Sequence, residues 1–377
     1  LFLFAPRLWP RNTDTTRSLL IIILILCTVF LSTVAFIAAR QVSEPHEWVH
    51  DSTIMTEEAM KFALAGRNPY SEDYRITPLA DWPWNPDGRE NPALDHYAYL
   101  PGMFMSGLPF FAFIEKALGW YDHRLFQLIA LALLLFVFMR MQMFSSRIRQ
   151  LLLIVFFLNP FFFYYFIVGH NDIVMYLLLI AAISLLSSKR FLWASVCIGI
   201  ALSMKHVAWL FLPLMLVYYF LQAKGYFKDR IRWVITKGWP IIILPALFIL
   251  PFVFAHAQVF VDDTVLYLTG DSTSTYPIQG IGLPAILLHT GHIANMWELV
   301  SFFWIQLVLM ILVIGTGIFV LKKNPALHWV VIISSLLLFV LWFFARSFSL
   351  SHLAVIIQFI IVGLFLFPGQ AQSKSAN

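Results

Sequence analysis

The sequence has 377 residues, of which 60% are hydrophobic and only 12% are charged. This composition excludes a soluble globular protein, because too few polar side chains remain to cover so large an apolar core. An aromatic content of 17% excludes a disordered chain, and a net charge of +5 gives no support for a nucleic-acid partner. The two cysteines lie inside apolar runs and indicate no disulfide framework. We therefore predict a single all-α polytopic membrane domain over residues 1–377.

Apolar stretches predict ten transmembrane helices, since a bilayer crossing takes roughly 17–25 residues. A further apolar run, 100–118, is interrupted by two prolines and two glycines, and we place it in the first outer loop as an interfacial helix. The ten predicted spans are 18–39, 125–144, 150–168, 172–187, 191–205, 207–222, 239–256, 298–321, 327–345 and 349–367.

Lysine and arginine predict the orientation, because short loops on the inner side of a membrane carry an excess of them. With the N-terminus inside, the basic segments 145–149 and 224–237 face inward, whereas most acidic residues face outward. If 100–118 crossed the membrane, every later loop would be inverted. We therefore predict a large first extracytoplasmic loop, 40–124, with interfacial helices, and a second one, 257–297.

Unusual polar residues gather at the predicted outer ends of the spans. Ionisable residues at such depths are costly and usually functional. A transporter would instead place its site near the bilayer midplane on broken helices of two repeated halves, and neither feature is visible. The outer-end residues are His170, Asn171, Asp172, Lys205, His206, Arg346 and His352, and the first loop adds Asp51, Tyr97 and Tyr99.

Several short motifs resemble the GT-C superfamily of membrane glycosyltransferases. Asp51 precedes an expected amphipathic helix that ends in Gly-Arg-Asn-Pro-Tyr at residues 66–70, as an acid precedes a helix ending in Gly-x-Pro-Tyr in that superfamily. The Tyr-Ala-Tyr-Leu-Pro-Gly run at 97–102 is similar to the motif that closes the same loop. Asn-Pro at 159–160, followed by Gly-His-Asn-Asp at 169–172, resembles an Asn-Pro and Gly-Gln-x-Asp pattern, with His170 where Gln is commoner.

The resemblance covers residues 19–220 best and is closest to the polyprenyl-phosphate-mannose-dependent mannosyltransferases. It implies transfer of a sugar, with mannose expected, from a polyprenyl-phosphate donor to a lipid, glycan or protein acceptor. The reaction would take place on the extracytoplasmic face of a bacterial or archaeal cell membrane, in contact with membrane lipids.

The chemistry of such a transfer suggests a role for each polar residue. Asp51 would be the base that takes the proton of the acceptor hydroxyl. Fixed positive charge would hold the donor phosphate, supplied by Lys205 and Arg346 with help from His206 or His352. The acceptor and sugar pocket would be formed by Asp172, His170, Asn171, Tyr97 and Tyr99.

Ordinary structural explanations compete with these roles. Lysine and arginine readily snorkel at span ends, Asp172 could cap the following helix, and Asp51 could be a solvated loop carboxylate. His46 and His50 have the i,i+4 spacing of zinc ligands, but no third ligand is evident, so we assign no metal site. A Mg²⁺ or Mn²⁺ ion shared by Asp51 and Asp172 stays an open alternative.

Two other function classes stay open at this point. The chain could be a non-catalytic GT-C-like subunit that acts as a scaffold in a larger complex, or a lipid or solute transporter. In the second outer loop, we expect the Asp262-Asp263 pair to cap the loop or form a polar rim.

Overall fold

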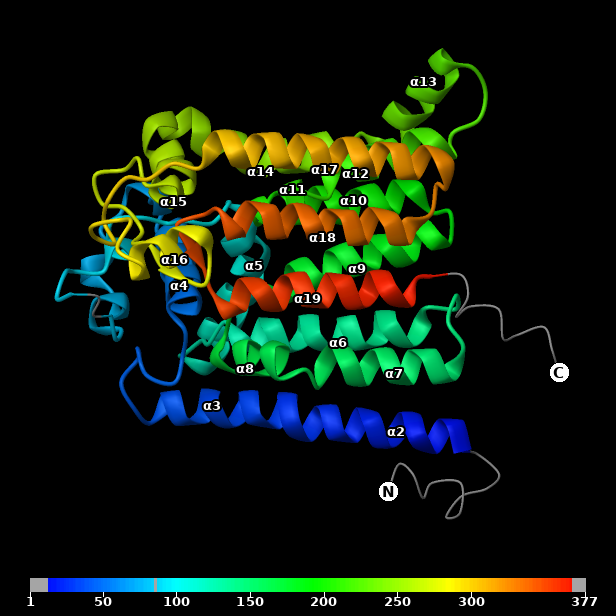
Figure 1. The fold of residues 1–377 in the computed structure, drawn as a ribbon. Helices are drawn as coiled ribbons and strands as arrows, with labels where there is room; N and C mark the ends of the chain where they lie inside the picture. The colour runs from blue at the N-terminus through cyan, green and yellow to red at the C-terminus, as the bar shows by residue number, and fades with distance from the viewer. Residues whose placement is uncertain (1–12, 85–86, 368–377) are drawn as a thin grey trace.

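Long apolar helices that lie side by side form the body of the molecule, and the computed structural model describes residues 13–84 and 87–367 (Figure 1). Within these residues, three helices are long and apolar enough to cross a membrane, namely Asp14–Gln41, Pro240–Thr269 and Phe303–Lys323. Ser146–Phe157 and Pro160–Val168 together make a fourth if their 55° bend lies within one broken span. The prediction of an all-α membrane protein is confirmed, whereas the number of spans stays a prediction.

The helices follow one another with short connections. The N-terminal part contains α2 (Thr13–Ile25), the π-helical turn η1 (Leu26–Phe30), α3 (Leu31–Gln41), α4 (Asp51–Leu64), the short 3-10 helices η2 (Pro69–Ser71), η3 (Tyr74–Ile76), η4 (Pro78–Asp81) and η5 (Pro92–Leu94), and α5 (Gly102–Leu118). The middle contains α6 (Arg124–Arg140), α7 (Ser146–Phe157), α8 (Pro160–Val168), α9 (Ile173–Ser187), α10 (Phe191–Leu202), α11 (His206–Trp209), α12 (Leu212–Gln222) and α13 (Phe227–Gly238). The C-terminal part contains α14 (Pro240–Val261), the π-helical turn η6 (Asp262–Leu266), α15 (Tyr267–Thr269), α16 (Leu283–His289), α17 (Phe303–Lys323), α18 (Leu327–Phe343) and α19 (Leu350–Phe365). Two short strands, β1 (Gln279–Gly280) and β2 (Ser347–Phe348), pair in parallel.

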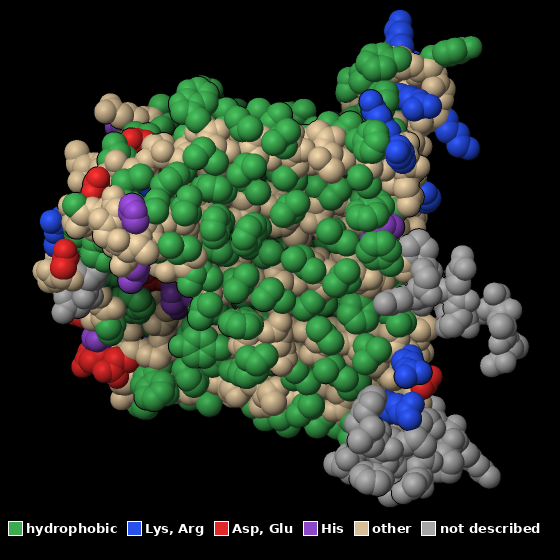
Figure 2. Space-filling view, viewed as in Figure 1, with side chains coloured by type: hydrophobic (Ala, Val, Ile, Leu, Met, Phe, Trp, Pro, Cys, Tyr) green, Lys and Arg blue, Asp and Glu red, His purple; other side chains and the backbone are tan. Residues whose placement is uncertain are grey.

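Helix α9 is the centre of the bundle. It is apolar on every side, packs against α6 and α10, and buries residues such as Met175, Leu179 and Ile183 completely. The peripheral helices α14 and α17 expose apolar side chains such as Phe254 and Trp304, at 81% and 74%, and Figure 2 shows the apolar surface that results. A helix that is apolar all round belongs in a core or in lipid, and this bundle contains both kinds.

The two ends of the bundle differ in structure and in charge. Helices α4, α15 and α16 lie at one end, and α13 projects from the other (Figure 1). Acidic and histidine side chains gather at the α4 end, whereas the lysines and arginines of α13 mark the opposite end (Figure 2). This separation agrees with the charge asymmetry that the sequence predicts across the membrane.

Two segments differ from expectation. Helix α4 is not amphipathic, because nearly every residue from Ser52 to Phe62 is buried; it packs against α5, η2 and η4 and is enclosed by loop-one residues. Helix α14 does not end near 256 but continues to Val261, with a kink at His256, whose backbone angles are φ −155° and ψ 76°. The kink lies where the sequence predicts the end of the span.

Candidate active site at the α4 end of the bundle

Asp51 is the first residue of α4. His50 is the N-cap, and its Nδ1 atom accepts a hydrogen bond from the Ser52 N–H at 3.2 Å. The same Nδ1 lies 2.6 Å from Asp51 Oδ1. Burial raises the pKa of Asp51, but the charge and hydrogen bond of His50 and the Ser52 N–H outweigh it, so this pKa lies below its ordinary value. The Asp51 carboxylate is therefore ionised at neutral pH and able to accept a proton.

The turn after α8 packs directly on the start of α4. The His50 N–H donates to the Val168 carbonyl at 2.7 Å, and the Thr53 hydroxyl donates to the Gly169 carbonyl. Gly169 has φ +96°, and a Cβ atom there would meet the Thr53 side chain, so the position needs glycine. The His50 and His170 rings stack with centroids 3.7 Å apart. These contacts place the Asp51 turn against the 169–172 turn.

Asp172 and Lys205 form an ion pair within this same region. Asp172 Oδ1 lies 2.6 Å from Lys205 Nζ, and the two side chains are 16% and 14% exposed. The Lys205 ammonium also lies 5.2 Å from the centre of the Tyr99 ring, a cation–π distance. Burial raises the pKa of Tyr99, and the charges of Asp51 and Asp172 raise it further. Tyr99 is therefore within electrostatic reach of both carboxylates.

Two predicted pocket residues keep unused hydrogen-bonding groups. Asn171 is 1% exposed, and neither atom of its side-chain amide has a hydrogen-bond partner in the described part of the chain. The same holds for His170 Nε2. Burial and the positive charges of His50, Lys205 and His352 lower the pKa of His170 well below its ordinary value, so its ring is neutral. A buried unpaired polar group costs roughly 1–3 kcal/mol, and a hydroxyl-rich ligand would relieve that cost.

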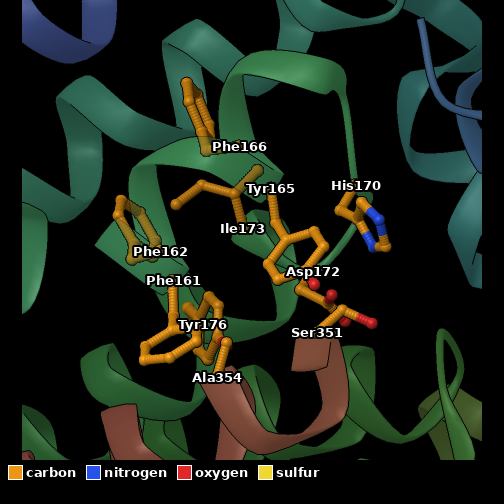
Figure 3. Close-up of a pocket in the computed structure, with 10 residues that line it drawn as sticks. All are labelled: Phe161, Phe162, Tyr165, Phe166, His170, Asp172, Ile173, Tyr176, Ser351 and Ala354. Carbon is orange, nitrogen blue, oxygen red and sulfur yellow. The ribbon is translucent and has the colours of Figure 1, made fainter. Parts of the chain in front are cut away.

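A groove leads from these polar residues between α8, α9 and α19. Figure 3 shows aromatic rings at one end and His170, Asp172 and Ser351 at the other. The lining residues are Phe161, Phe162, Tyr165, Phe166, His170, Asp172, Ile173, Tyr176, Ser351 and Ala354. The groove is thus polar near Lys205 and aromatic farther along, which suits a ligand with a charged head and an apolar tail.

A buried network of four charged residues supports α4. Arg40 donates to both Glu57 oxygens, at 3.0 and 2.8 Å, and to Asp122 Oδ2 at 3.0 Å. Asp122 also accepts from Arg124 Nε and Nη2, at 2.9 and 2.7 Å. The charges of the network sum to zero, and each residue is at most 7% exposed.

Arg124 also connects the two turns that carry the candidate carboxylates. Its Nη1 atom donates to the Trp48 carbonyl at 2.7 Å and to the Ile167 carbonyl at 3.3 Å. Trp48 lies three residues before Asp51, and Ile167 lies five before Asp172. The network therefore fixes the relative position of Asp51 and Asp172.

Arg346 lies apart from the Lys205–Asp172 pair. Its guanidinium donates to the carbonyls of Tyr276, Glu298 and Met296, at 2.7, 2.8 and 3.3 Å, and the residue is 3% exposed. These bonds organise the second predicted loop. The phosphate-binding role of Arg346 stays a prediction.

The other predicted residues occupy distinct places. His352 forms a capping box with Ser349 at the start of α19 and acts electrostatically on His170. His206 is the first residue of α11, next to Lys205. Tyr97 is fully buried in an aromatic cluster and donates its N–H to Asp263 Oδ2 at 2.8 Å.

Sequence reasoning missed Tyr276. Burial raises the pKa of Tyr276, and the Asp51 charge raises it further, so this tyrosine of the second predicted loop lies within reach of the candidate base. No local motif marks it, because a single tyrosine in a long loop has no periodicity. His50 was considered only as a zinc ligand, whereas in the structure it contacts Asp51.

A second polar cluster joins the first predicted loop to η6. His96 Nδ1 lies 2.8 Å from Asp263 Oδ1 and 3.9 Å from Asp262 Oδ2, and Nε2 lies 2.7 Å from the Ser274 carbonyl. In the described ranges, these are the only three side chains of the His, Cys, Asp and Glu types grouped at metal-ligand distances. Both ring nitrogens face acceptors, so a doubly protonated His96 satisfies the cluster as a clamp between the loops.

A comparison with protein families gives one match. Residues 104–221, less than a third of the chain, match the family model described as alpha-(1->6)-mannopyranosyltransferase, N-terminal domain. The matched stretch contains Asp172 and Lys205, but it does not reach Asp51 or Arg346. No curated protein matches the chain. Over residues 104–221 the predicted resemblance is thus confirmed, and this part of the chain is similar to the N-terminal domain of a GT-C mannosyltransferase family.

Proposed function

We propose that the protein is a membrane mannosyltransferase that moves mannose from a polyprenyl-phosphate donor to an extracytoplasmic lipid, glycan or protein acceptor. The observation that carries this proposal is the packing of the Asp51 turn against the turn that leads to the Asp172–Lys205 pair. An ionised carboxylate, an ammonium group and unused polar side chains therefore occupy one end of the bundle. These are the groups that such a transfer needs.

The Asp51 carboxylate is the general base of the proposed reaction. The acceptor hydroxyl oxygen forms a bond to the anomeric carbon of mannose while Asp51 takes the hydroxyl proton. The bond between that carbon and the phosphate oxygen breaks, and polyprenyl phosphate leaves with the electron pair. Attack from the side opposite the leaving group inverts the anomeric centre. Because the leaving phosphate is already a stable anion, no strong general acid is required.

Lys205 is the proposed donor-binding cation. An ammonium group has three donors, and Asp172 uses one of them at 2.6 Å, which leaves two for phosphate oxygens. The aromatic groove beside Asp172 would take the first part of the isoprenoid tail, and Asn171 and His170 would face sugar hydroxyls. Asp172 is balanced by Lys205, so these side chains do not offer a two-carboxylate metal site, and no step of the proposal passes through a metal.

The proposal includes ten spans with the α4 end outside. The acidic α4 end and the basic α13 end support this orientation. Helices α9 and α10 have 15 and 12 residues, fewer than a full crossing needs. Both lie inside the bundle, where neighbouring protein rather than lipid surrounds them, so their shortness is compatible with a spanning position.

The test measures mannose transfer from a short-chain polyprenyl-phosphate mannose to a panel of lipid acceptors. Asp51→Asn keeps the shape of the side chain but removes the base, so transfer should fall about 10²–10⁴-fold while donor binding persists. Lys205→Ala should weaken donor binding and also slow transfer, because the phosphate contact exists before and during bond cleavage.

Asp81→Asn is the matched control, because Asp81 is an exposed carboxylate of the same loop in η4. It should transfer mannose at the wild-type rate. A scaffold subunit would show no contrast among the three variants. Wild-type transfer by the Asp51→Asn protein would refute the proposed mechanism.

A further inference from the structure

Helix α13 differs from the rest of the bundle in its exposure. It projects from the end opposite α4 (Figure 1) and runs from Phe227 to Gly238. A capping box begins it, in which the Tyr226 N–H donates to Asp229 Oδ2 at 3.1 Å. It is the most strongly amphipathic of the described helices, because apolar and basic residues alternate at helical spacing.

An apolar stripe runs along α13 without a partner in the described chain. Phe227, Ile231 and Ile235 follow one another at intervals of four residues, and their exposed fractions are 73%, 39% and 63%. At 3.6 residues per turn, the three side chains lie within an arc of about 80°. A stripe of this kind is normally covered by a core, a partner or lipid.

Basic residues flank this stripe on both sides. Lys228 and Arg232 lie on one side, and Arg230 and Lys237 lie on the other, by the same helical spacing. Lys224 precedes the helix, and the single acid in the segment, Asp229, serves the capping box. The segment 224–238 therefore carries five positive charges and one negative charge, a net +4. This charge excludes a basic partner and favours an anionic surface.

Contacts with the bundle fix the direction of the stripe. Trp233 and Val234 pack against the hydrophobic core, and the Phe227 ring lies 5.6 Å from the Phe220 ring. The Arg230 guanidinium also lies 5.6 Å from the centre of the Phe220 ring. The helix is thus attached along one side, and the stripe faces outward beside the bundle, not into it.

We propose that α13 is an interfacial helix that binds anionic lipid headgroups, with its apolar stripe in the upper acyl layer. An apolar stripe with basic residues on either side is the pattern that lies in the headgroup plane of a membrane. Lysine and arginine near an anionic surface each add to the binding, and the bundle holds the helix at the required depth. The inference concerns the end of the molecule away from the candidate active site and does not depend on the transfer chemistry.

The test uses the full-length protein in nanodiscs of phosphatidylcholine with phosphatidylglycerol, and native mass spectrometry measures which lipid stays bound on release. Wild type should retain phosphatidylglycerol in preference to phosphatidylcholine. Lys228→Gln/Arg232→Gln should reduce that preference by about fivefold for each residue, since each basic residue near the surface contributes about that factor. Ile231→Asn/Ile235→Asn should reduce retention through loss of the apolar stripe.

Lys322→Gln/Lys323→Gln is the matched control. These lysines are exposed at the end of α17, outside α13, and their removal should leave most of the preference intact. Equal retention of the two lipids by wild type would point to an acidic protein partner and would overturn the proposal. So would an unchanged preference in the Lys228→Gln/Arg232→Gln protein or a control variant that loses as much. A wild-type result for the Ile231→Asn/Ile235→Asn protein would overturn insertion of the stripe.

Discussion

Asp122→Asn tests whether the buried ionic network holds α4. Asp122 is 0% exposed, and its carboxylate accepts four hydrogen bonds from Arg124 and Arg40. Burial raises the pKa of Asp122, but the two arginines lower it further than that, to about 2, so the group is charged. Asparagine has the same shape, yet either orientation of its amide turns an N–H₂ group toward a guanidinium. Glu57 would then face two buried arginines alone.

The loss of one partner from a buried ion pair costs ~3–5 kcal/mol, and we expect a loss of that size in the free energy of unfolding. Glu90→Gln breaks the exposed Arg75–Glu90 pair, whose atoms lie 2.8 Å apart, and should cost only ~0–1 kcal/mol. Unfolding in mixed micelles, followed by circular dichroism as sodium dodecyl sulfate is added, measures both variants. Equal stability of the Asp122→Asn and Glu90→Gln proteins would show that the network does not hold the fold.

Two further predictions concern pH and topology. Burial lowers the pKa of His96, but the hydrogen bond and charge of Asp263 outweigh it, so this pKa lies above its ordinary value; the stabilisation is present below the unfolded pKa of about 6.5. It should be lost as pH rises through the folded pKa, so the melting temperature of wild type should fall there relative to His96→Gln, and parallel pH curves would contradict this. For topology, cysteines at Ser71 and Ser274, in a background without the native cysteines, should react with an impermeant thiol reagent on intact cells. A cysteine at Ser146 should not, and its labelling would mean that 100–118 crosses the membrane.

Local sequence was sufficient for much of the fold. The helices follow the apolar runs, and α4 begins at Asp51, close to where the loop motif places it. Pairing of Asp172 with Lys205 agrees with the expectation that polar span ends meet at one depth. These features depend on composition and spacing within one segment or between neighbouring segments, which a single sequence contains.

Other features depend on contacts between distant segments. Arg40 meets Asp122 across 82 positions, and neither residue has a local pattern that names the other. The burial of α4 was unpredictable for the same reason, since the groups that neutralise Glu57 come from α3. Arg346 was judged by its charge alone, whereas its geometry is used to bind carbonyls.

The three carbonyl bonds of Arg346 have a consequence for how the protein can diversify. They tie residues 276–298 to the start of β2, outside the stretch that matches the mannosyltransferase family. The Lys205–Asp172 pair lies inside that stretch and shares no hydrogen bond with this loop in the described chain. Two parts of the site are therefore built by separate pieces of sequence. Evolution or engineering can remodel the loop around Tyr276 while the other piece keeps its own architecture.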